Sequence, residues 1–465
     1  MGDDAIQGKE SGGHEQMHLF GPDLEALSGR VDALRRELLA DPDPSLGGTL
    51  TEEALRERLG ETITEEGLGT EESLRIFTET LLPACVSTAH PRFLGFIPGA
   101  PTEAAKLFDS LLAATGICAD WWMEASGAVF AENEALRWIA DLLGWPPGAG
   151  GVFVSGGTSG NLSALAVGRD VWRRRAGPGR EARPAIAASG GGHSSISLAA
   201  RVLDAEVIDV TTDERGRILG PALREALERT EHDVFAVAAT AGTTNLGAID
   251  DLEAVADVCE ERGMWMHVDG AYGGAALAVP SARPMFAGVE RADSFVVDPH
   301  KWLFSPYDCA ALLYRDPELA RRAFTQTAEY IDFVEERSEW NPSDYAAHLS
   351  RRPRGLPFWF SLAANGSRAY SAAVERGLAL AHRAAELISA HPDLELVGEP
   401  QLSVVLFRRT GWGSGDYREW SDRALREGLT MTAPTSWRGE TLLRFCFVNP
   451  MTTEDDIGAV LDSLR

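Results

Sequence analysis

Lysine is rare in this chain of 465 residues, because 40 of its 43 basic side chains are arginines. The three lysines are Lys9, Lys106 and Lys301. Arginine stays protonated at any biological pH, whereas a partly buried lysine can lose its proton and act as an amine nucleophile. Lys301 follows the apolar run 294–298 and precedes Trp302. We expect Lys301 to be half buried, with a lowered pKa that suits imine formation, and a solvated surface lysine is the alternative.

Asp269 is a second group that could do chemistry, because it ends the apolar run Met264–Val268. It precedes Lys301 by 32 residues, an interval that fits one crossover helix and places both groups at the same edge of a parallel sheet. A carboxylate in such a place is costly unless it is paired with a cation. A protonated pyridine nitrogen would provide that cation, and a carboxylate that caps the next turn is the alternative.

A glycine-rich turn, Gly156–Asn161, lies between the apolar run Val152–Ser155 and a helical stretch, Leu162–Arg175. Free N–H groups at a helix start bind phosphate. The turn has neither the G-x-G-x-x-G spacing of dinucleotide sites nor the G-K-[ST] of a P-loop, so NAD and ATP lack their usual signatures. An ordinary strand-to-helix turn remains the alternative.

Two further strand ends carry polar groups. His193 follows three glycines after the run Ala185–Ala188, where an exposed imidazole can stack on a flat ring; a structural histidine is the alternative. After the run Val234–Thr240, the hydroxyl of Thr244 fits a polar contact at a cofactor edge. Asp250 could cap the helix that begins near Leu252.

The elements that must position these residues form an α/β pattern from about residue 150. Short apolar runs alternate with helical stretches such as 219–230 and 252–262, which predicts a mostly parallel sheet covered on both faces. The predicted strands are 152–155, 185–188, 206–210, 234–240, 264–269, 294–298 and 309–315. After Arg354, helical periodicity over 358–391, strands at 402–408 and 441–447, and a helix at 417–427 predict a smaller α+β domain.

The N-terminal region reads differently. Residues 1–20 look like a disordered acidic tail. An amphipathic helix is expected over 22–40, with an apolar stripe of Leu24, Leu27, Val31, Leu34 and Leu38. Packing within the chain and packing on a second subunit are both open for this helix.

Composition excludes several classes of protein. A net charge of −27 speaks against nucleic acid and anionic membranes as partners. No run reaches the ~18 apolar residues of a membrane span, and the polar N-terminus is not a secretory signal. The five cysteines are scattered without a C-x-x-C, which predicts reduced thiols in a cytoplasm and no metal site.

One cofactor accounts for these strand ends. Pyridoxal phosphate (PLP) needs an imine-forming lysine, a carboxylate on its pyridine nitrogen, a stacking group and a phosphate cup. Lys301, Asp269, His193 and the turn 155–161 supply them in that order. The turn also explains how so acidic a chain binds an anion.

The sequence resembles the group II PLP-dependent amino-acid decarboxylases over about residues 85–450, a family that includes aromatic-amino-acid, glutamate, histidine and diaminobutyrate decarboxylases. The resemblance rests on His90–Phe93, the S-G-G-T-x-x-N stretch 155–161, His193–Ser195, Gly242–Thr244, H-V-D-G-A-Y-G-G at 267–274, D-P-H-K-W-L at 298–303, and Ser350–Arg352 ahead of Trp359. Six or more motifs in one order are highly specific.

The resemblance implies a PLP-dependent fold type I, a homodimer with its active site at the interface, and roles for particular residues. Lys301 would hold the cofactor covalently, Asp269 would pair with the pyridinium and His193 would stack on the ring. The expected phosphate contacts are Thr158, Ser159, His300 and Asp298, the contacts around the ring are Thr244 and Asp250, and the substrate pocket is Phe96, Ile97 and Trp121. The implied organisation is a tail at 1–20, a swapped helical arm at 21–90, a large domain at 91–355 and a small domain at 356–465.

The chain departs from the family at one position. The family carries a tyrosine that protonates the substrate carbon on a loop before the Arg-Arg motif, and counting back from Ser350 puts Pro342 there. Tyr345, in a shifted register, is the expected acid, and Tyr330 lies further upstream. Replacement of this tyrosine in the family can redirect the product from an amine to an aldehyde.

We therefore expect a cytoplasmic PLP-dependent decarboxylase of an L-amino acid. Trp121 and Phe96 favour an aromatic substrate. The alternatives are an aldehyde synthase or another lyase with the same cofactor and, third, a non-enzymatic homologue, which the intact set of Lys301, Asp269 and His193 disfavours.

Overall fold

The computed structural model describes residues 21–41, 44–176, 183–325 and 339–465, and the chain divides into two compact units, Met1–Ser87 and Thr88–Arg465. The predicted tail, 1–20, lies outside the described residues. Among the described residues, no helix has both the length and the apolar character needed to cross a bilayer.

The first unit is helical. Its helices are α1 (Pro22–Ala40), α2 (Glu52–Leu59), α3 (Thr70–Ile76) and the π-helical turn η2 (Phe77–Leu81). Helix α1 has the predicted bounds, and Pro22 occupies its first turn, where a missing N–H costs nothing. None of its residues is buried, and Leu24, Val31 and Leu38 of the predicted stripe are 46–51% exposed.

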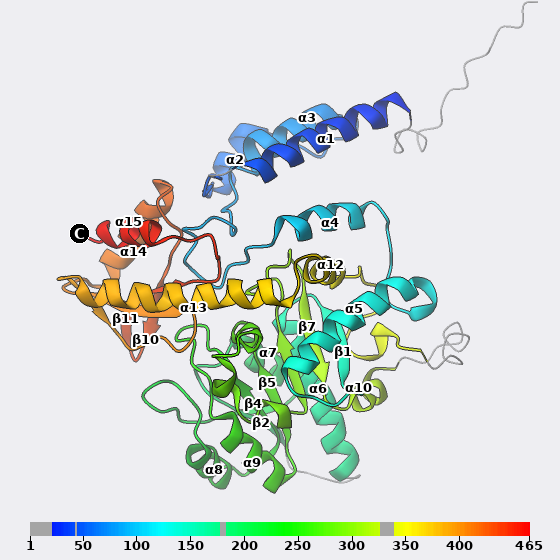
Figure 1. The fold of residues 1–465 in the computed structure, drawn as a ribbon, viewed down its shortest axis with the longest axis vertical. Helices are drawn as coiled ribbons and strands as arrows, with labels where there is room; N and C mark the ends of the chain where they lie inside the picture. The colour runs from blue at the N-terminus through cyan, green and yellow to red at the C-terminus, as the bar shows by residue number, and fades with distance from the viewer. Residues whose placement is uncertain (1–20, 42–43, 177–182, 326–338) are drawn as a thin grey trace, which may run out of the picture. The chain divides into compact units, whose positions relative to one another are not determined.

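The second unit is built around a seven-stranded sheet of order β1-β7-β6-β5-β4-β2-β3 (Figure 1). Its strands are β1 (Gly150–Val154), β2 (Pro184–Ala188), β3 (Glu206–Asp209), β4 (Asp233–Thr240), β5 (Trp265–Asp269), β6 (Ser294–Val297) and β7 (Ala310–Tyr314). Every predicted strand is present. All run in parallel except β7, which pairs antiparallel with both β1 and β6.

Alternating side chains of these strands enter two separate cores, as expected for a sheet covered on both faces. One core is closed by α6 (Gly157–Ala176), α7 (Ser194–Val202) and α10 (Pro317–Phe324). The other is closed by α5 (Trp122–Leu142), α8 (Gly220–Arg229) and α9 (Leu252–Arg262). The crossover segments also include the short turns η3 (Gly273–Ala278), η4 (Arg283–Phe286) and η5 (Val289–Arg291).

The C-terminal part forms a four-stranded antiparallel sheet of order β10-β11-β9-β8. Its elements are β8 (Leu394–Leu396), β9 (Val404–Arg409), α14 (Ser414–Arg426), β10 (Pro434–Trp437), β11 (Glu440–Cys446) and α15 (Glu454–Asp462). The sequence did not predict β8 and β10. The long helix α13 (Ser367–Ala390) packs against β8, β9 and α15, and also against η3 beside the large sheet (Figure 1).

Two helical regions differ most from the prediction. The helix expected over 358–391 is two helices, α12 (Leu356–Asn365) and α13, because Gly366 has a φ of +78°, which a continuing helix does not allow. Helix α6 begins at Gly157 and not at Leu162, so the glycine-rich turn forms its first turn. The remaining elements of this unit are α4 (Glu103–Ala113) and η6 (Pro342–Asp344).

Candidate active site

The carboxyl ends of the parallel strands bring the predicted residues together at one edge of the large sheet. Strand β1 ends before the glycine-rich turn, β5 ends at Asp269, and β6 ends one residue before Asp298. Backbone hydrogen bonds join these ends, since Gly270 donates to Val296 and Asp298 donates to Ala271. Ligands in α/β sheets bind at this edge.

Lys301 is ion-paired at this edge, with its Nζ 2.9 Å from Oδ2 of Asp298 and its side chain 23% exposed. The half-buried position was predicted, but the lowered pKa was not correct. Burial lowers the pKa of Lys301, but the carboxylates of Asp298 and Asp269 raise it more, so the net pKa lies above the usual value. The sequence placed both carboxylates near Lys301 but could not show that their charges outweigh the effect of burial on its pKa.

Asp298 is almost wholly buried and links Lys301 to His300. Its Oδ2 lies 3.5 Å from Nε2 of His300, whose Nδ1 accepts a bond of 3.0 Å from the backbone N–H of Cys309. Burial lowers the pKa of His300. Among the described residues, Oδ1 of Asp298 has no hydrogen-bond partner, so a buried acceptor is left over at this edge.

The first turn of α6 provides space and donors for an anion. A Cβ placed on Gly157 would lie 3.2 and 3.3 Å from the two carboxylate oxygens of Asp298, so only a glycine keeps this position open. Thr158 is exposed, and the hydroxyl of Ser159 lies 3.1 Å from that of Ser155. Polar side chains and free N–H groups at the start of a 20-residue helix suit a phosphate.

Hydrogen bonds fix the orientation of the side chains of Asp269 and His193. Oδ2 of Asp269 accepts from Nδ2 of Asn161 at 2.8 Å, and its Oδ1 accepts from the N–H of Ala271 at 3.1 Å. His193 is the exposed N-cap of α7, and its Nδ1 accepts from the N–H of Ser195 at 3.2 Å. Both groups therefore face the strand-end edge with fixed orientations, and the residues present fit PLP.

Asp250 does not cap α9, contrary to the prediction, because Asp251 does so by accepting from the N–H of Ala254. Both oxygens of Asp250 instead accept from backbone N–H groups, those of Ile218 at 2.6 Å and Thr240 at 2.7 Å. Burial raises the pKa of Asp250 to about 7. This carboxyl fastens the end of β4 to the segment before α8.

Thr244 and Phe96 meet through an arginine that the sequence analysis missed. Arg444 of β11 is buried, and it donates to the carbonyl of Thr244 and to that of Phe96, the latter at 3.0 Å. Burial lowers its pKa, and within the described part of the chain its two hydrogen bonds go to backbone carbonyls. Arg444 lies 143 residues after Lys301 in the sequence, so only the tertiary structure reveals its position.

The remaining predicted pocket residues are dispersed in a single chain. Phe96 is 58% exposed with a φ of +48°, and Ile97 is partly buried against the large core. Trp121 precedes α5, where the next N–H donates to Asn341. Among the residues that the structure describes, no hydrogen bond or ring contact joins Trp121 to the groups around Lys301.

Tyr345 lies near the amino-terminal ends of the parallel strands, whereas Lys301 lies at their carboxyl ends. Its ring stacks on Trp340 with centroids 4.1 Å apart, and the indole of Trp340 donates to the carbonyl of Gly151 at the start of β1. Tyr345 is 5% exposed, and burial raises its pKa. Five strand residues span about 16 Å, so its hydroxyl does not reach Lys301 of the same chain. Tyr330 lies outside the described residues.

Tyr307 is a second residue that the sequence analysis missed. Its ring is 51% exposed and lies 4.7 Å from that of His300, and it is close enough to Lys301 for each to shift the pKa of the other. It lies four residues beyond the D-P-H-K-W-L segment and six residues after Lys301. Proximity in sequence was the available signal.

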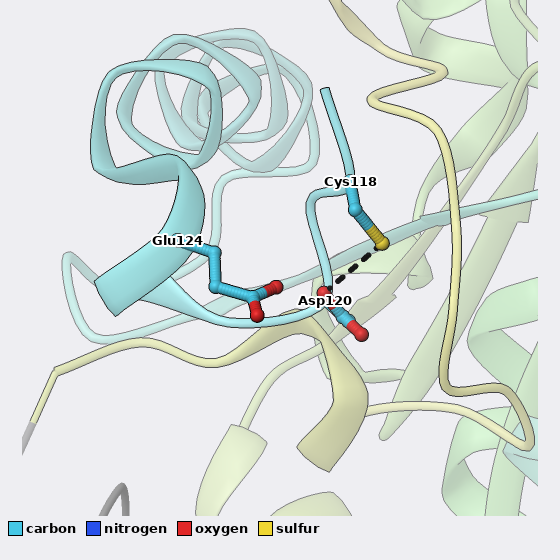
Figure 2. A group of neighbouring side chains, drawn as sticks. All are labelled: Cys118, Asp120 and Glu124. Atoms are coloured by element: carbon cyan, nitrogen blue, oxygen red, sulfur yellow. Dashed lines mark hydrogen bonds between the residues drawn. The ribbon is translucent and has the colours of Figure 1, made fainter. Parts of the chain in front are cut away.

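Three donor side chains cluster beside Trp121, and Figure 2 shows them. The Sγ of Cys118, a carboxylate oxygen of Asp120 and one of Glu124 lie within 4.8 Å of one another. Cys118 donates to Asp120 at 3.3 Å, and Asp120 raises the pKa of Glu124. The three groups therefore interact with one another through a hydrogen bond and through charge.

Comparison with known proteins agrees with this geometry. Residues 53–410 match the family described as the pyridoxal-dependent decarboxylase conserved domain. An aromatic-L-amino-acid decarboxylase from Bacillus atrophaeus is 32% identical over 433 residues, 90% of this chain and 89% of its own length. An L-2,4-diaminobutyrate decarboxylase from Rhizobium meliloti is 31% identical over 86% of this chain and 83% of its own.

The fold is shared with solved structures. The crystal structure of Oryza sativa TDC with PLP and tryptamine superposes with a TM-score of 0.88 at 24% identity, covering 96% of this chain and 98% of that one. This chain therefore belongs to the pyridoxal-dependent decarboxylase family, whose members are PLP-dependent amino-acid carboxy-lyases.

Proposed function

We propose that this chain removes CO2 from an aromatic L-amino acid to leave the amine, with Lys301 as the residue that binds PLP covalently. The observation that carries the proposal is the convergence of Lys301, Asp269, His193 and the first turn of α6 at one sheet edge. PLP, when bound, withdraws electrons from the bond to the substrate carboxylate.

The side chains have distinct tasks in this proposal. Lys301 gives up its proton to become a nucleophile, and Asp298 at 2.9 Å is the nearest base. Asp269 holds a proton on the pyridine nitrogen by charge pairing. His193 covers the ring face, and Thr244 lines its edge. Further phosphate contacts come from Thr158, Ser159 and His300.

An aromatic substrate is favoured by two features. Phe96 is an exposed aromatic residue, and the hydrogen bond from Arg444 to its carbonyl fixes its backbone. The Bacillus atrophaeus relative acts on aromatic amino acids by its name. The Rhizobium meliloti relative is named for diaminobutyrate, which makes a basic substrate the competing class.

A homodimer is supported by exposed apolar surface. The stripe of Leu24, Val31 and Leu38 on α1 has no buried residue, and no hydrogen bond or ring contact among the described residues joins Trp121 to the groups around Lys301. In the proposed dimer α1 packs on the second copy and Trp121 serves that copy's site. Val31→Glu should reduce the mass measured by light scattering from dimer to monomer, and an unchanged mass would remove α1 from the interface.

A cytoplasmic location is supported by the thiols, since none of the five cysteines is paired and three are buried. The third possibility, a non-enzymatic homologue, is disfavoured because Lys301, Asp269 and His193 are all present.

The nature of the acid separates two products. Tyr345 as the acid requires its ring to leave its buried position against Trp340. If no tyrosine delivers the proton, aldehyde formation with oxygen uptake is the second candidate function. Tyr345→Phe that leaves amine formation unchanged would exclude Tyr345 as the acid.

The test is a panel of amino acids scored together for CO2, amine and hydrogen peroxide. Borohydride reduction of the PLP-loaded protein, followed by peptide mass spectrometry, should locate the cofactor on Lys301. Lys301→Ala should abolish labelling and CO2 release. Lys106→Ala is the matched control, because Lys106 pairs with Glu103 on α4 and should lose neither. Labelling elsewhere, or equimolar peroxide and CO2, would refute the proposal as stated.

A further inference from the structure

A chain of buried hydrogen bonds runs beneath the candidate cofactor site. It ends at Asp269 and His193, the two residues expected to contact the cofactor ring. Nε1 of Trp265 bonds Oγ of Ser294 at 2.8 Å, and Ser294 bonds Nδ1 of His267 at 2.9 Å. Nε2 of His267 lies 2.8 Å from Oδ1 of Asn161, whose Nδ2 bonds Asp269 at 2.8 Å. These five side chains are 0–6% exposed.

Asn161 is the branch point of this chain. Its Nδ2 donates one hydrogen to Asp269 and the other to Oγ of Ser195, both at 2.8 Å. The amide orientation follows from its partners, because an ionised carboxylate only accepts, so the NH2 group must face Asp269. Oδ1 of Asn161 is then an acceptor and requires a donor from His267.

His267 supplies that donor as a neutral ring. Burial lowers its pKa to about 4, so at neutral pH it carries one proton. Because Oδ1 of Asn161 only accepts, the proton lies on Nε2, and Nδ1 accepts from the hydroxyl of Ser294. The hydroxyl oxygen of Ser294 in turn accepts from the indole of Trp265. Every donor in the chain has one consistent direction.

The second branch reaches His193. Because Nδ2 of Asn161 donates to Ser195, the hydroxyl hydrogen of Ser195 is free to point to Nδ1 of His193, 2.8 Å away. The N–H of Ser195 also donates to this nitrogen. A neutral His193 therefore carries its proton on Nε2, the nitrogen that is left for the cofactor or substrate.

We propose that Asn161 and His267 are positioning residues, which orient the carboxylate of Asp269 and, through Ser195, the imidazole of His193. This inference rests on the proposed function, in which Asp269 pairs with the pyridine nitrogen and His193 covers the ring. Two apolar side chains would fill the same space without buried polar groups to satisfy. The need to orient Asp269 and His193 explains why these buried residues are polar.

Asn161→Asp tests the directed donor with almost no change of shape. The substituted carboxyl faces Asp269 and His267 directly, and His193 through Ser195, while Lys301 acts on Asp269 from the other side. Two carboxyls at hydrogen-bond distance cannot both ionise easily. When one is protonated, its O–H replaces the lost donor, and at higher pH the two groups repel each other.

The measurement is the dissociation constant of PLP, titrated into the cofactor-free protein by absorbance across pH. The ratio of the Asn161→Asp constant to the wild-type constant should be near one at acidic pH and rise by about tenfold or more at alkaline pH, as an unmet buried polar group implies. Titration of PLP itself cancels in this ratio. A residue that only fills space would give a ratio independent of pH.

A second pair of variants keeps the test independent of that substitution. His267→Gln retains a donor toward Asn161, whereas His267→Phe fills the space without one. We expect wild-type PLP affinity for the glutamine variant and about tenfold weaker binding for the phenylalanine variant. Ser361→Ala is the matched control. The buried hydroxyl of Ser361 forms hydrogen bonds with Tyr370 and Thr102, which are not part of the hydrogen-bond chain through Asn161. This substitution should lower thermal stability without changing PLP affinity.

The outcomes separate the inference from the function on which it rests. A wild-type protein that binds no PLP would overturn both. Wild-type binding with a pH-independent ratio for Asn161→Asp, and equal affinities for the two His267 variants, would overturn the inference alone. Should His267→Phe not fold, the Asn161→Asp ratio still decides.

Discussion

A buried ion pair between Glu132 and Arg351 fastens the segment before α12 to helix α5. The guanidinium donates to the two carboxylate oxygens at 2.6 and 2.8 Å and to the carbonyl of Ala119 at 2.8 Å. The carboxylate also accepts from the N–H of Gly355 at 2.8 Å. The two side chains are 3% and 0% exposed. Removal of one partner would leave the other charge buried.

Glu132→Gln keeps the volume but replaces an accepting oxygen with an NH2 group that faces the guanidinium. Breaking one partner of a buried pair costs about 3–5 kcal/mol, a large part of the ~5–15 kcal/mol typical of folded proteins. With an unfolding entropy of about 2.1 cal/mol/K per residue, the second unit should lose roughly 4–6 °C in Tm. Glu132→Leu combined with Arg351→Met removes both charges and should cost less than Glu132→Gln.

The assay is thermal unfolding of the cofactor-free protein, followed by circular dichroism. Glu386→Gln is the matched control, since Glu386 pairs with Arg383 at 2.7 Å on the surface, where the side chains are 66% and 42% exposed. Its loss should be below about 1 kcal/mol. The reasoning is refuted if Glu132→Gln melts within a degree of this control, or if the double variant melts below the single one.

Two further predictions concern acid stability and the phosphate turn. Burial lowers the pKa of His348 to about 4, so the unfolded chain, with a histidine pKa of about 6.5, takes up the proton first as the pH falls. Up to about 3 kcal/mol of the free energy of unfolding should be lost between pH ~6.5 and ~4. In urea unfolding, His348→Gln should make the free energy of unfolding less dependent on pH over this range. An unchanged pH dependence would show that His348 does not cause the loss. Gly157→Ala places a methyl group 3.2 Å from a carboxylate oxygen of Asp298 and should weaken PLP binding about tenfold by overpacking. Gly127→Ala, which adds a methyl into open space on α5, should bind PLP normally, and equal affinities would show that the turn has room to spare.

The sequence predicted the large sheet well, because its strands are apolar on both faces and are separated by helix-length segments. It also predicted which residues follow each strand. Lys301 and Asp269 could be placed on one edge from their spacing alone, since consecutive parallel strands share an edge. Strands β8 and β10 were missed because neither has an apolar run: β10 has no buried residue and β8 has one.

The partners of the site residues could not be predicted in the same way. Asp250 and Asp251 are adjacent, and only the backbone path shows that the second caps α9 while the first binds two distant N–H groups. Asn161 lay within a quoted motif without a role, because its partners are 34 and 108 residues away. Tyr345 could be counted relative to Ser350 but not placed at an edge of the sheet.

By itself, the sequence determined the fold class and the cofactor, because hydrophobic period and residue type are local properties of the chain. Only the tertiary structure decided the partners of each group: Asp298 pairs with Lys301, His267 bonds Asn161, and Arg444 bonds the carbonyl of Phe96. Hydrogen bonds and pKa shifts depend on separations of a few ångströms between residues far apart in the chain, and the packing of the sheet, its helices and the C-terminal strands sets those separations.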